Sequence, residues 1–222
     1  MNVIPLDLQI LNALSALLLL LSFSMLSQRR IVSLVNLLAM QGLLLTAATL
    51  LVAWRTGETH LYLSALLTFA LKVVFLPWLL HRLIRRLEVY WDTEPLLNIP
   101  GTMLVGVLIV VFAFGLAQPI AELASESTRN TIGIAVAVIL LSFLMMITRS
   151  KAMSQVVGFL SMENGLFFGA MGATRGMPMV VELGIALDIL VAMLVLGVFF
   201  FQIREQFDSL DLHHLESLKE GD

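Results

Sequence analysis

Long apolar segments, separated by short polar turns, make up most of this chain. A helix needs about 20 apolar residues to cross the hydrocarbon of a bilayer. By this criterion we place seven spans at 8–26, 31–53, 61–80, 103–120, 132–147, 154–174 and 178–201. We find no extended alternation of apolar and polar residues of the kind that builds a membrane barrel. The sequence therefore predicts an all-α integral membrane protein of about seven transmembrane helices.

The composition agrees with a membrane location and narrows the chemistry. Charged residues make up 13% of the chain, against about 25% in ordinary soluble domains. There are no cysteines, which removes thiol catalysis and iron–sulfur ligation, and the histidines fall in turns or at predicted helix ends. We therefore expect no catalytic residue, metal site or cofactor in this chain. The net charge of −3 gives no reason to expect a nucleic-acid partner.

The basic residues indicate an orientation in the membrane. One alternating set of turns, together with the C-terminal tail, holds nine Lys and Arg residues, whereas the other set holds three. Positive turns face the cytoplasm in membrane proteins. We therefore expect a multi-pass protein of the cell inner (plasma) membrane, with its N-terminus outside and its C-terminus in the cytoplasm.

Four ionisable residues fall within the predicted spans: Lys72, Glu163, Glu182 and Asp188. A charged Lys or Asp at a helix centre costs about 2.5–3.5 kcal/mol on insertion scales. These groups must therefore be paired, hydrated or neutralised by a proton. Intramembrane acids and bases are the usual parts of proton relays, so we take these four as candidate proton-relay residues.

Their sequence neighbours suggest how they are placed. Asn164 adjoins Glu163, and the small residues that follow allow another helix to approach closely. Pro77, five residues after Lys72, lacks an N–H and predicts a kink that frees a backbone carbonyl near the ammonium. Glu182 and Asp188 lie about 120° apart on one helix, so we expect them to address different neighbours.

Two stretches of the chain look alike. In each, a basic turn is followed about eleven residues later by Met and then a polar residue, Gln41 in the first stretch and Glu163 in the second. Parallel repeats of this kind occur in transporters. The similarity suggests two three-helix units joined by the fourth helix. The expected divisions are 1–101, an N-terminal unit with a cytoplasmic loop; 102–131, the connecting helix and outer loop; and 132–222, the C-terminal unit with its tail.

The strings around the acids resemble a known family. The segment 157–165, which contains M-E-N-G, and the segment 181–188, which reads V-E-L-G-I-A-L-D, are similar to component E of hydrogenase-4 and related formate-hydrogenlyase complexes. The segments 71–77 and 210–221 fit the same family. The resemblance covers nearly the whole chain. It implies a membrane subunit of an oxidoreductase (hydrogenase) complex whose partners include antiporter-like, nickel–iron and iron–sulfur subunits.

The last three predicted helices also resemble the K subunit of bacterial complex I and the C subunit of Mrp-type cation/proton antiporters. In that wider family, two glutamates on adjacent helices serve proton translocation. Glu182 falls on the second of them. Leu160 occupies the position of the first, and Glu163 lies three residues later, about 4.5 Å along a helix.

Our hypothesis is a non-redox, membrane-arm subunit that contributes carboxylates, and Lys72, to redox-coupled proton translocation. Asn164, Pro77 and Gln41 would support them. A subunit of a cation/proton antiporter-like complex without hydrogenase would need the same acids, so the sequence leaves that alternative open. A structural membrane scaffold is a third alternative, and it predicts that the intramembrane charges form closed pairs.

Overall fold

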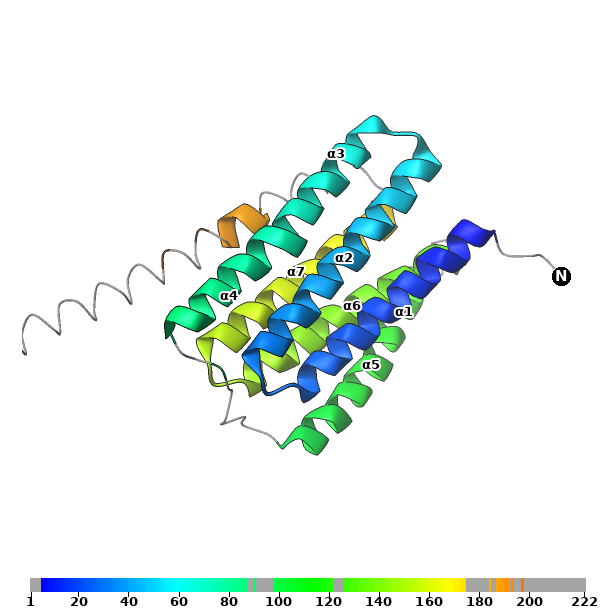
Figure 1. Ribbon diagram of the computed structural model, residues 1–222. Helices are drawn as coiled ribbons and strands as arrows, with labels where there is room; N and C mark the ends of the chain where they lie inside the picture. Colours follow the sequence, from blue (N-terminus) through cyan, green and yellow to red (C-terminus); the bar gives the residue numbers. More distant parts are fainter. Residues whose placement is uncertain are drawn as a thin grey trace, which may run out of the picture. The chain divides into compact units, whose positions relative to one another are not determined.

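The computed structural model describes residues 5–87, 90, 98–121 and 126–174, together with 184, 187–191, 193 and 197. At 119–121, 126–130, 173 and 174 only the backbone is described. The chain divides into two compact units, Met1–Asp188 and Ile189–Asp222. All the helices labelled in Figure 1 belong to the first unit.

Every element described in the first unit is helical (Figure 1). The helices, in chain order, are α1 (Leu6–Ser27), α2 (Ile31–Thr56), α3 (Thr59–Thr68), the π-helix η1 (Phe69–Phe75), α4 (Leu76–Leu87), α5 (Ile99–Ala121), α6 (Glu126–Thr148) and α7 (Ala152–Thr174). α3, η1 and α4 follow one another without a break and together form one long helical rod. Helices of this composition and length satisfy their own backbone hydrogen bonds, as lipid requires.

The first six predicted spans are confirmed as helices. Five of the described helical segments are long and apolar enough to cross a membrane: Leu6–Ser27, Ile31–Thr56, Thr59–Arg86, Ile99–Gln118 and Thr131–Thr148. α7 matches the sixth predicted span but is not among these five, and it carries the polar pair Glu163 and Asn164. The seventh predicted span, 178–201, falls largely outside the described residues, so the total of seven stays a prediction.

Helix α2 is the centre of the bundle. It packs against α1, α7 and the three-part rod α3–η1–α4, while α6 packs against α1, α5 and α7. A cluster of buried apolar side chains lies where α1, α2, α6 and α7 meet, with one member from α3. It comprises Leu11, Leu18, Leu45, Ala48, Ala53, Leu61, Ile134, Ala135, Val138, Phe167, Phe168 and Met171. Two helical hairpins, α1–α2 and α6–α7, thus share one apolar core.

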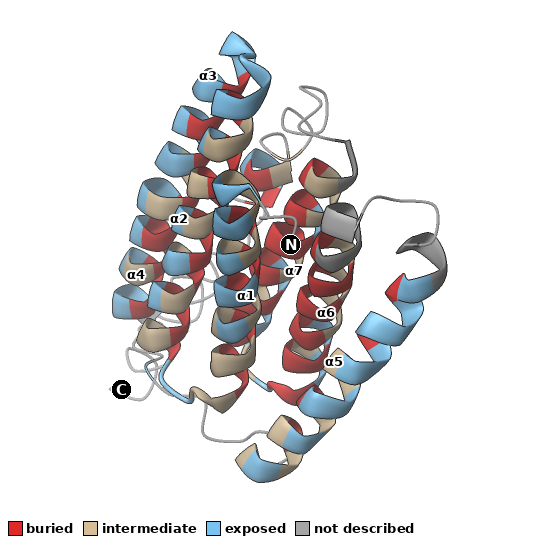
Figure 2. Cartoon of the chain, turned by 90° about the vertical axis from the view of Figure 1, so that its right-hand side faces the viewer, coloured by how far each residue is buried: buried red, intermediate tan, exposed pale blue. Residues whose placement is uncertain are grey.

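Helix α5 has the most exposed apolar surface. Only 17% of the apolar 18-residue stretch of α5 is buried, compared with 61% of the corresponding stretch of α6. Figure 2 shows α5 at the side of the bundle with most of its length exposed. Its large exposed side chains include Leu104, Val107, Leu108, Val111 and Phe112. A surface of this kind suits contact with lipid rather than with water.

Five buried hydroxyl groups are satisfied within their own helices. Ser15, Ser22, Thr49, Ser142 and Thr148 each donate a hydrogen bond to the carbonyl four residues earlier, at 2.7–2.9 Å. A Ser or Thr hydroxyl can make this bond without disturbing the helix ladder strongly. These residues therefore lower the hydropathy of the helices without adding unpaired polar groups to the interior.

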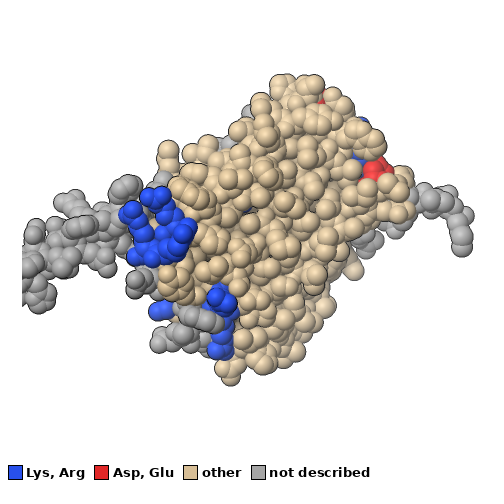
Figure 3. All heavy atoms as spheres, viewed as in Figure 1, with Lys and Arg blue, Asp and Glu red and all other residues tan. Residues whose placement is uncertain are grey.

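Most of the basic residues that the structure describes lie at one end of the bundle. Arg29 and Arg30 lie in the turn between α1 and α2, and Arg82, Arg85 and Arg86 lie near the end of α4 (Figure 3). Arg55 lies at the other end of α2, where it pairs with Asp7 at 2.7 Å. The separation of charge fits the expected alternation of turns. The orientation itself stays a prediction.

Arg149, in the turn between α6 and α7, is buried and donates hydrogen bonds at the C-terminal end of α1. Its guanidinium donates hydrogen bonds to the carbonyls of Leu26 at 3.0 Å and Met25 at 3.4 Å, and also to the carbonyl of Gln28. The last carbonyls of a helix have no intrahelical donor, and a cation suits the negative end of the helix dipole. Arg149 therefore caps α1 from the second hairpin.

Candidate functional site

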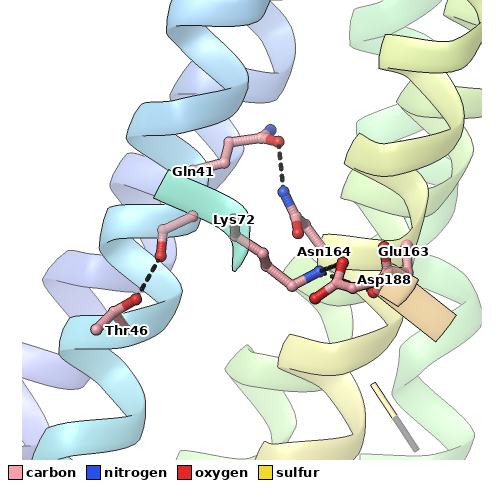
Figure 4. A network of polar contacts seen from close by, with 7 residues as sticks. Gln41, Thr46, Lys72, Glu163, Asn164 and Asp188 are labelled. Atoms are coloured by element: carbon pink, nitrogen blue, oxygen red, sulfur yellow. Dashed lines mark hydrogen bonds and ion pairs between the residues drawn. The ribbon is translucent and has the colours of Figure 1, made fainter. Parts of the chain in front are cut away.

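Three of the four predicted intramembrane charges meet at one point inside the first unit. The Nζ of Lys72 lies 2.7 Å from Oε1 of Glu163 and 2.7 Å from Oδ1 of Asp188 (Figure 4). The side chains of the three residues are at most 4% exposed. Lys72 lies on η1 and Glu163 lies on α7. Asp188 is one of the few described residues that follow residue 183. We call these three residues the charge triad.

The ammonium is placed by an unusual piece of helix. η1 is a π-helical stretch of seven residues that ends directly before Leu76 and Pro77. The N–H of Leu76 bonds the carbonyl of Leu71, five residues back, instead of the usual fourth. Stretches of π-helix are frequent at functional sites. The π-helix around Lys72 was not predicted from the sequence, and the kink expected at Pro77 stays a prediction.

Gly42 of α2 lets the π-helix come close. A Cβ built on Gly42 would lie 2.9 Å from Cβ of Lys72 and 3.1 Å from its carbonyl carbon and oxygen. Real Cβ atoms essentially never come as close as 2.9 Å to another carbon, so glycine is the residue that fits. The backbone of Lys72 therefore packs directly against α2 at Gly42.

The small residues after Glu163 set the position of α7 against α6. A Cβ at Gly165 would lie 2.9 Å from Cγ1 of Val138, and one at Gly169 would lie 2.8 Å from Cβ of Ala135. The predicted close approach of a second helix is confirmed, and that helix is α6. Tight packing on this side fixes the rotation of α7, which directs Glu163 to Lys72 on the other side.

An aromatic ring closes one side of the charge triad. Nζ of Lys72 lies 6.0 Å from the centre of the Phe167 ring, at the outer limit for a cation–π contact. Phe167 is also in contact with Gly184, where an added Cβ would lie 2.6 Å from Cδ2 of the ring. The ring thus lies beside both the ammonium and Gly184, four residues before Asp188 in the chain.

A second polar chain runs beside the charge triad. Nε2 of Gln41 donates to the hydroxyl of Ser22 at 2.8 Å, and Nδ2 of Asn164 donates to Oε1 of Gln41 at 3.3 Å. Gln41 is completely buried and Asn164 is 2% exposed. These bonds join α1, α2 and α7 one residue away from Glu163, and the supporting role expected of Gln41 and Asn164 stays a prediction.

Each acid of the charge triad has one oxygen with no protein donor. Oε2 of Glu163 and Oδ2 of Asp188 are buried and have no hydrogen-bond partner among the described residues. A buried polar atom without a partner costs about 1–3 kcal/mol, and more if it is charged. Within the part of the chain that the structure describes, the arrangement is one base between two acids whose outer oxygens have no donor.

Glu182, the fourth predicted relay residue, lies outside the described residues. Sequence reasoning missed Gly42, Ser22 and Phe167. Phe167 had a usable signal, since it follows Glu163 by four residues and so shares its helix face. The part of the chain that the structure describes holds no group of three or more His, Cys, Asp or Glu residues that could bind a metal ion.

Comparison with known proteins supplies relatives at two distances. No family model and no solved structure matches the chain. It is 23% identical over 181 residues to hydrogenase-4 component E of Escherichia coli K12, covering 82% of this chain and 84% of that protein. A Shigella flexneri protein of the same name matches equally. These distant relatives support a membrane subunit of a multi-subunit complex.

A nearer relative is the Mycobacterium tuberculosis protein named "Uncharacterized protein Rv0085". It is 35% identical to this chain over 194 residues, which cover 87% of this chain and 88% of the relative. Identity at this level over nearly the full length of both proteins indicates a common helical framework. The chain therefore belongs to the family of the Mycobacterium tuberculosis protein Rv0085.

Proposed function

We propose that this protein is a non-redox, membrane-arm subunit of a hydrogenase-4-type, complex-I-related assembly. In this role it contributes intramembrane carboxylates to redox-coupled proton translocation. The observation that carries the proposal is the contact of one buried ammonium, on Lys72, with two buried carboxylates at 2.7 Å each. The distant relation to hydrogenase-4 component E supplies the class of assembly.

The unequal charge distinguishes this site from a structural staple. In a scaffold that only holds helices together, we expect equal numbers of buried acids and bases, because each unpaired buried charge is costly. Here two acids share one base, and two of the four carboxylate oxygens have no donor among the described residues. A group of this kind changes its preferred protonation when Lys72 moves, because the ammonium stabilises whichever carboxylate it contacts. That property is what a proton relay needs.

The proposal includes the two-unit plan. Ser22 and Gln41 are 19 residues apart and bond across the α1–α2 hairpin, and Ser142 and Ser161 are 19 residues apart and bond across the α6–α7 hairpin. α1 packs on α6 and α2 packs on α7, so corresponding helices are neighbours. Lys72 comes from the expected N-terminal three-helix unit, 1–101, and both acids come from the expected C-terminal three-helix unit, 132–222. Transporter sites commonly lie at such an interface between repeats.

The proposed partners are the antiporter-like membrane subunits and the peripheral nickel–iron and iron–sulfur subunits of such an assembly. The assembly would lie in the inner membrane with the basic end of the bundle in the cytoplasm. Glu182 would extend the pathway beyond the charge triad. Electrons would stay with the partner subunits, since we assign this chain no redox group.

The first test is purification of the tagged full-length chain from native membranes, followed by identification of its partners. Co-purifying nickel–iron and iron–sulfur subunits support the proposal. Antiporter-like subunits without these metals point instead to the cation/proton antiporter alternative.

The second test compares Glu163→Gln and Asp188→Asn with the control Asp7→Asn in inverted membrane vesicles. Electron transfer, started with hydrogen or formate, and the resulting pH gradient are both measured. We expect the complex to assemble and transfer electrons in all variants, and the pH gradient to collapse in Glu163→Gln and Asp188→Asn alone. An undiminished gradient in both would refute the relay.

A further inference from the structure

The charge triad does not balance if all three groups are ionised. One ammonium and two carboxylates leave a net charge of −1 at a site where every side chain is at most 4% exposed. An isolated buried charge is strongly disfavoured, and a carboxyl group in such a place takes up a proton instead. The site therefore needs one further positive charge to be neutral.

The described surroundings offer no second cation. The polar side chains nearest the charge triad on α2 and α7 are Gln41 and Asn164, which are neutral. Among the described residues, the ion pairs of Glu163 and Asp188 involve Lys72 alone. The other buried base, Arg149, caps the end of α1. Within the described part of the chain, the charge is therefore left to a species small enough to fit between the side chains already present.

The Lys72 side chain lies between the two acids. A donor placed 2.7 Å from two carboxylate oxygens on two different segments is making charge-assisted hydrogen bonds to both. The missing positive charge thus belongs on the acids. Their remaining oxygens, Oε2 of Glu163 and Oδ2 of Asp188, are the two buried atoms that lack a donor, and a carboxylic acid O–H is a donor.

We infer that Glu163 and Asp188 together hold a single proton, bound to their outer oxygens, so that the charge triad is neutral as a whole. The proton supplies the donor that these oxygens lack, and Lys72 contacts the inner oxygen of each acid. The inference extends the proposed function, on which its role in transport rests, by naming the species that the site carries at rest. It assigns the site to a proton and not to a metal cation.

Neutrality makes a counting prediction for variants. Removing either acid leaves one carboxylate for one ammonium, so no proton is needed. Removing the ammonium leaves two acids, and both must be protonated. Removing Lys72 and Glu163 together leaves one acid, which must again carry one proton. Replacing Lys72 by Arg keeps the charge and should leave the proton in place.

Infrared spectroscopy of the purified full-length chain in lipid nanodiscs measures this count directly. A protonated carboxyl group absorbs at a C=O stretching frequency separate from that of a carboxylate, and it shifts in D2O. The signal of each variant is taken relative to wild type. Glu163→Gln and Asp188→Asn should each lose the band of the charge triad, and Lys72→Met should give about twice its intensity. Lys72→Arg, the double variant Lys72→Met with Glu163→Gln, and the control Asp7→Asn should match wild type.

The result that overturns the inference is a wild-type spectrum whose carboxylic band is unaffected by Glu163→Gln and by Asp188→Asn. A band that appears only after Na⁺ is removed would overturn it too, since a metal cation would then hold the place of the proton. If Lys72→Met does not fold, the two acid variants and Lys72→Arg still decide the matter. Failure of the proposed function looks different, because the band would be present while the pH gradient in vesicles did not depend on the acids.

Discussion

Gly42 and Lys72 lie so close that a single methyl group on Gly42 would come within 2.9 Å of Cβ of Lys72. The contact involves the backbone of Lys72 as well as its side chain, so it cannot be relieved by rotating the lysine tail. The approach of α2 to η1 therefore decides where the ammonium can reach.

Replacing Gly42 by Ala should destabilise the protein by about 1–3 kcal/mol, the usual cost of overpacking a well-packed interior. It should also weaken the pH gradient in vesicles, because η1 is pushed away from the acids. The free energy of unfolding can be measured by titration with SDS in mixed micelles. Gly115→Ala is the matched control, since an added Cβ there meets nothing within 4 Å. Equal effects at both positions would contradict the role of Gly42.

The charge triad should show a larger energetic coupling than the ion pair at the end of the bundle. Lys72–Glu163 and Arg55–Asp7 have the same separation of 2.7 Å, but the side chains of the second pair are 43% and 20% exposed. Exposed pairs contribute about 0.2–1 kcal/mol, whereas breaking a buried pair costs about 3–5 kcal/mol. A double-mutant cycle with Lys72→Met and Glu163→Gln, compared with one on Arg55 and Asp7, measures the difference. Similar coupling energies in the two cycles would contradict the burial argument.

The apolar framework of this protein could be predicted from its sequence because lipid imposes one simple requirement. A helix that crosses the membrane needs a long run of apolar residues, and six such runs were found as helices. The same requirement singled out Lys72, Glu163 and Asp188, since charges in such runs are costly and must have a reason.

The meeting of those three residues could not be predicted, because it depends on helix rotation and on the π-helix. A π-helix rotates every later residue of the helix relative to a regular α-helix. In the segment around Lys72, Pro77 is the one residue that indicates an irregular helix. The role of Gly42 was hidden for a related reason: a glycine in a helix shows its purpose only when the neighbouring backbone is known.

Gln41 should contribute more to stability than Ser161, the corresponding partner in the second hairpin. Replacing Gln41 by Leu removes the partner of both Ser22 and Asn164, and leaving a buried amide unpaired costs about 1–3 kcal/mol. Ser161→Ala should cost about 0.5–1.5 kcal/mol, because Ser142 keeps the carbonyl of Val138 as its partner. SDS titrations of the two variants test this order, and a reversed order would argue against the Gln41 chain.

The predicted orientation can be tested with single cysteines, because the natural chain has none. Glu58→Cys lies in the exposed turn between α2 and α3, and Ser150→Cys lies in the exposed turn between α6 and α7. A membrane-impermeant maleimide applied to intact cells should label the first, and the second only after the membrane is opened. The opposite pattern would invert the orientation that we assign from the basic residues.

Replacing Arg149 by Lys should destabilise the protein even though the charge is kept. A guanidinium donates in several directions in one plane, whereas an ammonium on a different stem does not reproduce that geometry. Hydrogen bonds to a charged group are worth about 1.5–3 kcal/mol, so we expect a loss of this order in the free energy of unfolding. Arg82→Lys is the control, since Arg82 is exposed and lies over the Trp78 ring at 5.5 Å. A loss at Arg82 as large as at Arg149 would contradict the capping role.

The cap on α1 also orders events during synthesis. The carbonyls of Met25, Leu26 and Gln28 belong to the first hairpin, but their donor reaches the ribosome exit only after α6 has been made. Until then the end of α1 has only its own cap, the bond from the N–H of Gln28 to the carbonyl of Met25. Insertion of the second hairpin therefore supplies the donor that completes the hydrogen bonding of the first helix.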